Sequence, residues 1–112
     1  MLYDDLMYAI EAIAHEHPDG FTIKVTTLEL VTSGIAVAYK ATQNSYQRSG
    51  LYTCIQHAFY NDGYIGGWRN QNGEMQYDSI RMFKDLRKAV KWGRKQDQIA
   101  IFDIDNGWEI VL

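Results

Sequence analysis

Six basic side chains lie within a stretch of twelve residues, and their spacing makes them the clearest candidate for binding a partner. They are Lys84, Arg87, Lys88, Lys91, Arg94 and Lys95. At about 100° per helical residue they share an arc of roughly 120°, opposite an arc of apolar residues. A surface of this kind docks on an acidic protein or contacts nucleic-acid phosphates. We take Arg87, Lys88 and Lys91 as its binding residues.

The alternative interpretation of this helix is a solvated face that only keeps the chain soluble. The chain has a net charge of −3, and its acids concentrate in residues 1–30, where six of them accompany one base, Lys24. Nucleic-acid binding by a single basic helix in an acidic chain would be weak, sensitive to salt and independent of base sequence.

A polar segment, residues 42–45, is the second candidate site. Thr42, Gln43, Asn44 and Ser45 are four consecutive hydrogen-bonding side chains between an expected buried strand and an expected helix. Loops in such places often carry ligands, so these residues could bind a small molecule or a peptide. The same side chains could instead cap the helix and close the turn.

The third candidate is Trp68 beside Arg69, which could stack on a base or on an acidic peptide. The preceding Gly66 and Gly67 do not form a phosphate loop, because no Lys-Ser/Thr pair follows and the segment leads into a hairpin rather than a helix. Adjacent glycines in a strand indicate a bulge or the close approach of another backbone. The structural alternative is therefore a tryptophan packed across a glycine.

Histidine and cysteine give little sign of catalysis. Cys54 and His57 are three residues apart on an expected helix, where a thiolate and an imidazole could meet. However, Cys54 lies beside the apolar stripe and no third group orients the pair, which favours a buried cysteine and a surface histidine. His15 and His17 are two residues apart, a spacing that argues against a zinc pair on a helix.

Three aspartates near the ends of expected strands support the least favoured hypothesis, a small enzyme. Asp78, Asp103 and Asp105 could serve acid–base or metal chemistry if their carboxylates converged. Single aspartates at strand ends more commonly make turns and caps. We therefore predict no catalytic residue, no metal site and no cofactor.

Hydrophobic periodicity predicts three helices and six strands. The helices are expected at about 3–16, between an N-cap at Ser49 and a stop at 61–63, and at 84–96. The strands are expected at about 21–25, 35–41, 64–69, 74–80, 98–104 and 108–112. The last four strands should form two hairpins around Asn72-Gly73 and Asn106-Gly107, in type I′ turns whose central residues both have positive φ.

The resulting order, α-β-β-α-β-β-α-β-β, predicts a single α+β domain over residues 1–112. Its sheet should be largely antiparallel, with helices packed on it. Two helices are expected to cover one face, and the third part of an edge. The predicted core comprises residues on apolar stripes or in continuous apolar strands. Its members are Ile10, Ile13, Val37, Ile55, Phe59, Leu86, Val90, Ile99 and Ile101.

Composition narrows the class of protein. A hydrophobic content of 46% with one proline indicates an ordered globule. The single cysteine, Cys54, allows no internal disulfide and fits a reducing compartment. The first residues carry acids where a secretory signal carries bases, and no apolar run reaches membrane-spanning length. We therefore expect a cytoplasmic protein without membrane contact.

Several segments carry a resemblance that covers about residues 21–104. They are Thr42-Gln-Asn-Ser45, Gly66-Gly-Trp68, Tyr77-Asp-Ser79, Phe83, Ala89 and Gln98-Ile-Ala-Ile-Phe-Asp103. In them the chain resembles uncharacterised small proteins of phages and conjugative elements, and is similar to accessory domains of large polyvalent proteins. The resemblance implies a bacterial cell that hosts a mobile element, and it implies no catalytic residue.

The hypothesis favoured by the sequence is a small non-catalytic interaction protein of a mobile genetic element, which binds a host or element-encoded protein. The alternative is weak, non-specific nucleic-acid binding through the basic helix. Salt separates the two, because phosphate binding collapses as ionic strength rises whereas an apolar protein interface persists.

Overall fold

The computed structural model describes residues 3–112, in the order of elements that the sequence predicts with two short additions. The helices are α1 (Tyr3–Glu16), η1 (Lys40–Thr42, a 3-10 helix), α2 (Gln47–Phe59) and α3 (Leu86–Lys95). The strands are β1 (Phe21–Lys24), β2 (Ile35–Ala38), β3 (Ser45–Tyr46), β4 (Tyr64–Arg69), β5 (Met75–Phe83), β6 (Ala100–Asp103) and β7 (Trp108–Val111). The additions are η1 and β3. No helix within residues 3–112 is long and apolar enough to cross a membrane.

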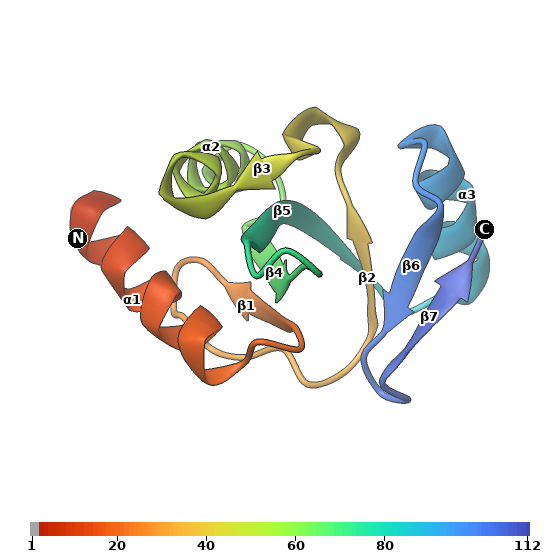
Figure 1. The fold of residues 1–112 in the computed structure, drawn as a ribbon. Helices are drawn as coiled ribbons and strands as arrows, with labels where there is room; N and C mark the ends of the chain where they lie inside the picture. Colours follow the sequence, from red (N-terminus) through yellow and green to blue (C-terminus); the bar gives the residue numbers. More distant parts are fainter. Residues whose placement is uncertain (1–2) are drawn as a thin grey trace.

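The seven strands form one antiparallel sheet, as an α+β fold of this order requires. The strand order is β1-β4-β5-β2-β6-β7, and β3 pairs with β5. β5 is the central strand, with β4 along one side and β3 followed by β2 along the other. Figure 1 shows α1 and α2 at one end of the molecule and α3, β6 and β7 at the other.

Both predicted hairpins are confirmed, but their predicted turn type is wrong. β4 pairs with β5 and β6 with β7, with no strand between the members of either pair. Only Gly73 (φ 78°) and Gly107 (φ 72°) have positive φ, whereas Asn72 and Asn106 do not. Each loop is longer than two residues, so one residue with positive φ is enough to return the chain.

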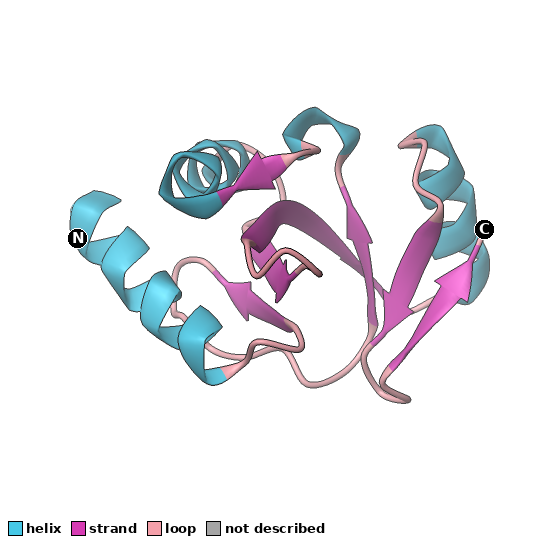
Figure 2. Ribbon diagram, in the orientation of Figure 1, coloured by secondary structure: helices cyan, strands magenta, loops and turns pink. Residues whose placement is uncertain are grey.

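All three helices lie on the same face of the sheet, which we name the covered face. Residues two apart in a strand share a face. Phe21, Ile65 and Tyr77 share one by their register and pack with α1 and α2, while Val37 and Ile101 lie on the same face and pack with α3. The prediction that the third helix covers part of an edge is therefore wrong, and the other face carries no helix of the described residues (Figure 2).

The predicted core is correct for residues that face the helices and wrong for three others. Ile10, Val37, Ile55 and Ile101 are buried, and Ile13 and Val90 are half-buried. The exceptions are Phe59, Leu86 and Ile99, which are 45%, 50% and 85% exposed. Each stands at or next to the end of its element: Phe59 ends α2, Leu86 begins α3 and Ile99 precedes β6. Periodicity alone does not show where a packed face stops.

The predicted N-cap of the second helix is also wrong. α2 begins at Gln47, directly after β3, and its N-cap residue Tyr46 makes no side-chain cap hydrogen bond. The chain turns from strand to helix through Gln47, whose φ is 56°. Ser49 therefore lies inside the first turn, where its C=O accepts a hydrogen bond from the Thr53 hydroxyl.

Candidate functional site

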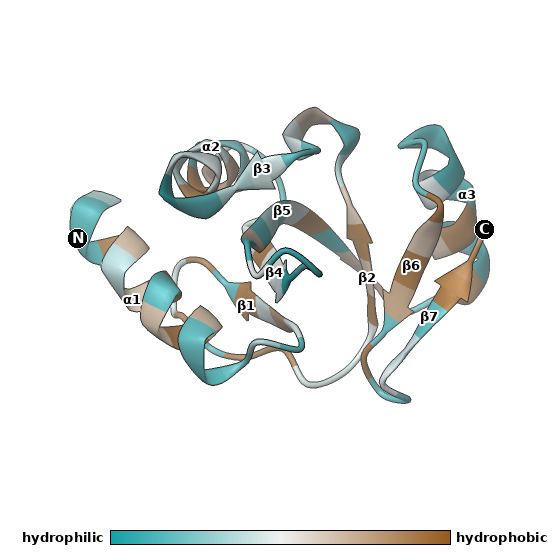
Figure 3. Ribbon diagram, in the orientation of Figure 1, coloured by the Kyte–Doolittle hydropathy of each residue, from teal (hydrophilic) through white to brown (hydrophobic). Residues whose placement is uncertain are grey.

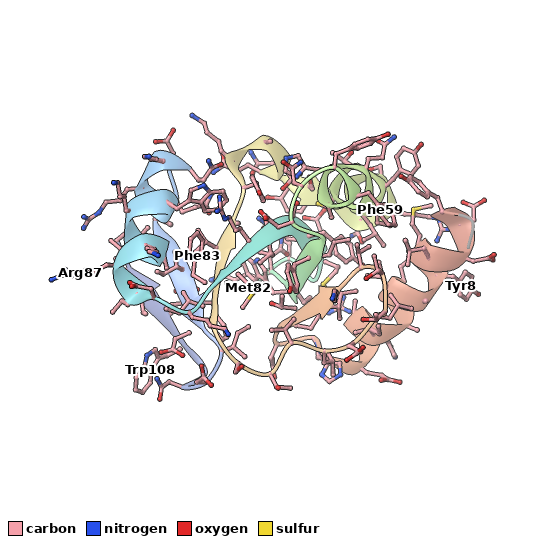
Figure 4. All side chains as sticks on the ribbon, turned by 180° about the vertical axis from the view of Figure 1, so that it is seen from behind. Tyr8, Phe59, Met82, Phe83, Arg87 and Trp108 are labelled. Atoms are coloured by element: carbon pink, nitrogen blue, oxygen red, sulfur yellow. The ribbon has the colours of Figure 1, made fainter. Side chains whose placement is uncertain are left out.

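The basic face of α3, defined as Lys84, Arg87, Lys88, Lys91, Arg94 and Lys95, is exposed along its whole length. None of these six side chains lies within ion-pair distance of a carboxylate of residues 3–112. Asp85 instead caps α3, because its carboxylate accepts a hydrogen bond from the Lys88 N–H. The predicted binding residues Arg87, Lys88 and Lys91 therefore share one unneutralised surface, and Arg87 extends outward from the helix (Figure 4).

A shallow apolar groove runs along α3 beside these charges. It is lined by Leu86, Arg87, Val90, Lys91 and Arg94. Ala89 and Gly93 are buried and turn toward the sheet, which leaves Leu86 and Val90 on the flank of the helix. Leu86 was predicted to be buried. It is exposed because Ala89 and Gly93, rather than Leu86, face the sheet. We name this feature the α3 groove: an apolar strip bordered by positive charge.

The hairpin of β6 and β7 adds exposed apolar side chains at the same end of the molecule. Ile99, Phe102, Trp108 and Val111 are all exposed, Val111 to 80%. Figure 3 shows the hydrophobic colouring of this hairpin, and Figure 4 shows Trp108 at the end that carries Arg87, with Tyr8 at the far end. The register divides them between two faces, because Trp108 lies on the covered face while Phe102 and Val111 lie on the other.

The acids of residues 1–30 do not neutralise the basic face. α1 lies at the end of the molecule opposite α3 (Figure 1). Asp4 and Glu11 of α1 form ion pairs with Arg48 of α2. The acids of α1 therefore do not offset the charge of the basic face.

The polar segment 42–45 has two buried members with structural partners. Thr42 Oγ1 accepts a hydrogen bond from the Ser79 N–H at 3.0 Å, and Ser45 Oγ donates to the Thr42 C=O at 2.7 Å. These bonds tie the segment to β5. Gln43 and Asn44 are exposed, so they are the members of this predicted site that a ligand could reach.

Trp68 and Arg69 do not converge on one ligand. They are adjacent in β4, so their side chains leave opposite faces of the sheet. Arg69 Nη1 donates to the Gly73 C=O at 2.8 Å within the hairpin. The neighbouring glycine is explained by packing, because a Cβ built on Gly67 would lie 2.6 Å from the ring of Phe21.

Cys54 and His57 do not form a nucleophilic pair. Cys54 is fully buried, and burial raises the pKa of its thiol to about 12, which keeps the thiol protonated. His57 Nδ1 instead lies 2.7 Å from Ser79 Oγ. Burial lowers the pKa of His57, against the opposing effect of Asp62, so the ring is neutral at physiological pH.

A polar and aromatic cluster joins the two halves of the covered face, and sequence reasoning did not find it. The ring of Tyr39 lies 4.6 Å from that of His57 and 4.7 Å from that of Trp92. The Tyr39 hydroxyl donates to Asp62, and burial followed by this bond raises the pKa of Tyr39. The guanidinium of Arg81 lies 5.2 Å from the ring centroid of Trp92 and 4.0 Å from the Asp62 carboxylate. We name these residues the seam.

The seam satisfies its own polar groups rather than presenting them to a ligand. Asp62 accepts from Tyr39 and faces Arg81, and His57 is bonded to Ser79. Its members come from five separate elements and loops, so no local spacing signals it. Its evident role is to hold α2 and α3 on one sheet.

The three aspartates singled out for acid–base or metal chemistry do not converge. Asp103 accepts hydrogen bonds from Asn106 within the β6–β7 turn, and Asp105 accepts one from the Gly34 N–H in the loop before β2. The prediction that Asp78 lies at a strand end is wrong. Asp78 lies inside β5 and faces away from the helices. Residues 3–112 contain no group of three or more His, Cys, Asp or Glu side chains placed to hold a metal ion.

Comparisons with protein-family models, with curated proteins and with solved structures found no match for the chain. The function of the chain therefore has to be inferred from its fold and from the surfaces that the fold exposes. Among these surfaces, the basic face of α3 is the one at which charge, exposure and apolar contact area coincide.

Proposed function

We propose that this chain is a small non-catalytic interaction protein that binds an acidic partner protein through the basic face and the α3 groove. One observation carries the proposal: six exposed basic side chains without ion pairs border an apolar strip. Charge without a partner inside the molecule favours a partner outside it, and electrostatic complementarity steers such encounters.

A protein fits this surface better than a nucleic acid does. A phosphate backbone neutralises lysine and arginine but offers nothing apolar to Leu86 and Val90, whereas an acidic protein surface supplies both kinds of contact. Nucleic-acid binding through the basic face is the competing proposal, and salt dependence separates the two.

The setting that we propose is a mobile genetic element. The resemblance of residues 21–104 to proteins of phages and conjugative elements supports it, and the acidic partner would then be a host or element-encoded protein. Such a partner would belong to the machinery that processes nucleic acid.

A charge-reversal variant tests the binding surface. Arg87→Glu combined with Lys91→Glu removes two positive charges from the α3 groove and should leave the fold intact, because exposed charges contribute little to stability. Tagged wild-type and variant proteins are used to capture partners from a lysate of the native cell at physiological ionic strength. We expect the wild type to retain acidic proteins that the variant loses, as identified by mass spectrometry.

The matched control is Lys24→Glu combined with Arg69→Glu, which changes the net charge equally at exposed positions outside α3. It should retain the same partners as the wild type. The proposal is wrong if both double variants capture the same proteins. It is also wrong if the wild type instead shifts random-sequence DNA or RNA, the shift fades steeply with salt and the α3 variant alone abolishes it.

A further inference from the structure

The outer edge of β7 is free of partners within the described residues. β7 stands last in the strand order and pairs with β6 alone. The opposite edge of the sheet is occupied, because β1 exchanges backbone hydrogen bonds with Glu29 and Val31. A free edge presents unpaired N–H and C=O groups that can pair with a strand of another chain.

The outward-facing groups of this edge belong to Glu109 and Val111. The Leu112 N–H donates to the Ile99 C=O at 2.9 Å, so Leu112 and Ile99 form a hydrogen-bonded pair of the β6–β7 ladder. Bonded and non-bonded pairs alternate along an antiparallel ladder. The register of β6 and β7 therefore places Glu109 and Val111 in non-bonded positions, with their N–H and C=O groups directed away from β6.

The free edge adjoins the α3 groove. Val90 of the groove packs against the same small core as Ile110 and Leu112. A Cβ built on Gly93 would lie 2.9 Å from Leu112 Cδ1, so α3 approaches the end of β7 closely. A strand added to β7 would direct every second side chain to the covered face, which is the face that carries Leu86, Val90 and the basic residues.

We propose that β7 accepts an extended segment of the acidic partner as an eighth strand, whose carboxylates meet the basic face of α3 and whose apolar side chains enter the α3 groove. The inference rests on the proposed function and specifies how the partner binds. Backbone hydrogen bonds to Glu109 and Val111 would give affinity, and the side chains over α3 would give specificity.

A second copy of the chain fits this edge poorly. Two β7 strands paired about a two-fold axis would place both α3 helices on the same face of a continuous sheet. Each basic face, five residues of α3 and Lys84 before it, has no ion pair in the described structure, and the two faces would repel one another. A separate acidic segment is therefore the occupant to which the charges point.

The test uses a blocked peptide in which threonine occupies every second position and glutamate and valine share the others. Nuclear magnetic resonance follows the backbone amides of the intact chain during titration. We expect the peptide to protect the amide hydrogens of Glu109 and Val111 from exchange. A peptide with lysine in place of glutamate should not bind.

Val111→Pro removes one outward N–H, while the N–H groups that point to β6 stay, and proline is tolerated at such an edge. Its affinity for the peptide should fall by about tenfold, the loss expected for one or two backbone hydrogen bonds. Val111→Thr is the matched control, because it keeps the N–H and the branched Cβ, and it should bind as the wild type does. Should the proline variant fail to fold, the protection of Glu109 in the wild type still decides the question.

Strand addition is wrong if Val111→Pro binds the peptide unchanged, if protection is confined to α3, or if the chain itself dimerises through β7 in sedimentation. These failures differ from failure of the proposed function. Binding lost in the Arg87→Glu, Lys91→Glu variant but kept in Val111→Pro leaves the basic surface standing and removes strand addition. Binding kept in the charge-reversal variant removes the proposed function.

Discussion

Asp78 is an acid whose ionisation opposes folding near neutral pH. It is half-buried inside β5, and no hydrogen bond or ion pair to its carboxylate is found within the described residues. Burial raises its pKa from 3.8 to about 6. The folded state therefore keeps the proton to a higher pH than the unfolded state, so stability falls as pH rises between these two values and stays low above them.

Asp78→Asn should stabilise the protein at neutral pH by about 1–3 kcal/mol, since one pKa unit corresponds to about 1.4 kcal/mol and the side chain is partly solvated. The gain should vanish as pH falls below about 4, where the carboxyl is neutral in both states. Urea denaturation at a series of pH values measures this. Asp19→Asn, at an exposed acid outside the helices and strands, is the control for the removal of one carboxylate. A neutral-pH loss of stability in Asp78→Asn would mean that the carboxylate has a stabilising partner.

At single residues, the sequence predicts that a side chain makes hydrogen bonds but not which group is its partner. Thr42 and Ser45 were correctly singled out as hydrogen-bonding residues, but their type could not say whether the partner is a ligand or the backbone of β5. The seam was missed because Tyr39, Asp62 and Trp92 meet only after the sheet has formed. Spacing along the chain reports neighbours on one element and is silent on neighbours from different ones.

At the scale of elements, β3 and α2 approach one another more closely at Gly50 than any neighbour approaches another glycine of the described residues. Gly50 lies in the first turn of α2, and a Cβ built on it would lie 2.3 Å from the carbonyl carbon of Ser45. That neighbour is backbone and cannot rotate away. Glycine inside a helix is ordinarily destabilising by about 1 kcal/mol relative to alanine, so a close approach is the physical reason for it here.

Gly50→Ala should therefore destabilise the protein, by about 1–3 kcal/mol or more, although the same change in an open helix is stabilising. Ser49→Ala at the next position is the control. If Ser49 capped α2, as its sequence position suggests, alanine would cost about 1 kcal/mol. Because Ser49 lies within the helix, we expect almost no loss. Thermal denaturation of both variants checks the pair, and a stable Gly50→Ala would show that β3 can move away from α2.

Elements were predictable where their signals are local. Both hairpins followed from a glycine between two apolar runs, and α1 followed from apolar spacing closed by Pro18. The turn geometry, the start of α2 and the side covered by α3 depended on loop length and on packing between distant segments. Only the three-dimensional structure shows such features. The exposure of Leu86, which defines the α3 groove, is a further example.

At the scale of the whole molecule, the two ends differ in the size of their hydrophobic cores. Around α1 and α2, fourteen buried residues form the larger core, while the core under α3 contains four. The larger core lies at the end that carries α1, and the smaller core at the end that carries α3. The end to which we assign binding is therefore the end with less apolar burial, as expected for regions that rearrange on binding.

Native-state hydrogen exchange should resolve these two ends as separate tiers of stability. Amides of β6 and β7 should exchange through a local opening of lower free energy than amides of β4 and β5, because fewer buried side chains hold the former. Ile101→Ala, in the smaller core, should lower the opening free energy of the β6–β7 amides by about 2–5 kcal/mol, through lost burial and a cavity. The β4–β5 amides should change only if their exchange already requires global unfolding. Ile55→Ala should lower the opening free energy of the β4–β5 amides alone, because the larger core stays formed during the local opening of β6 and β7. A single opening free energy for all four strands would contradict this prediction and would mean that the seam makes the two ends one cooperative unit. A partner strand would then have to pair with β7 without local opening of β6 and β7.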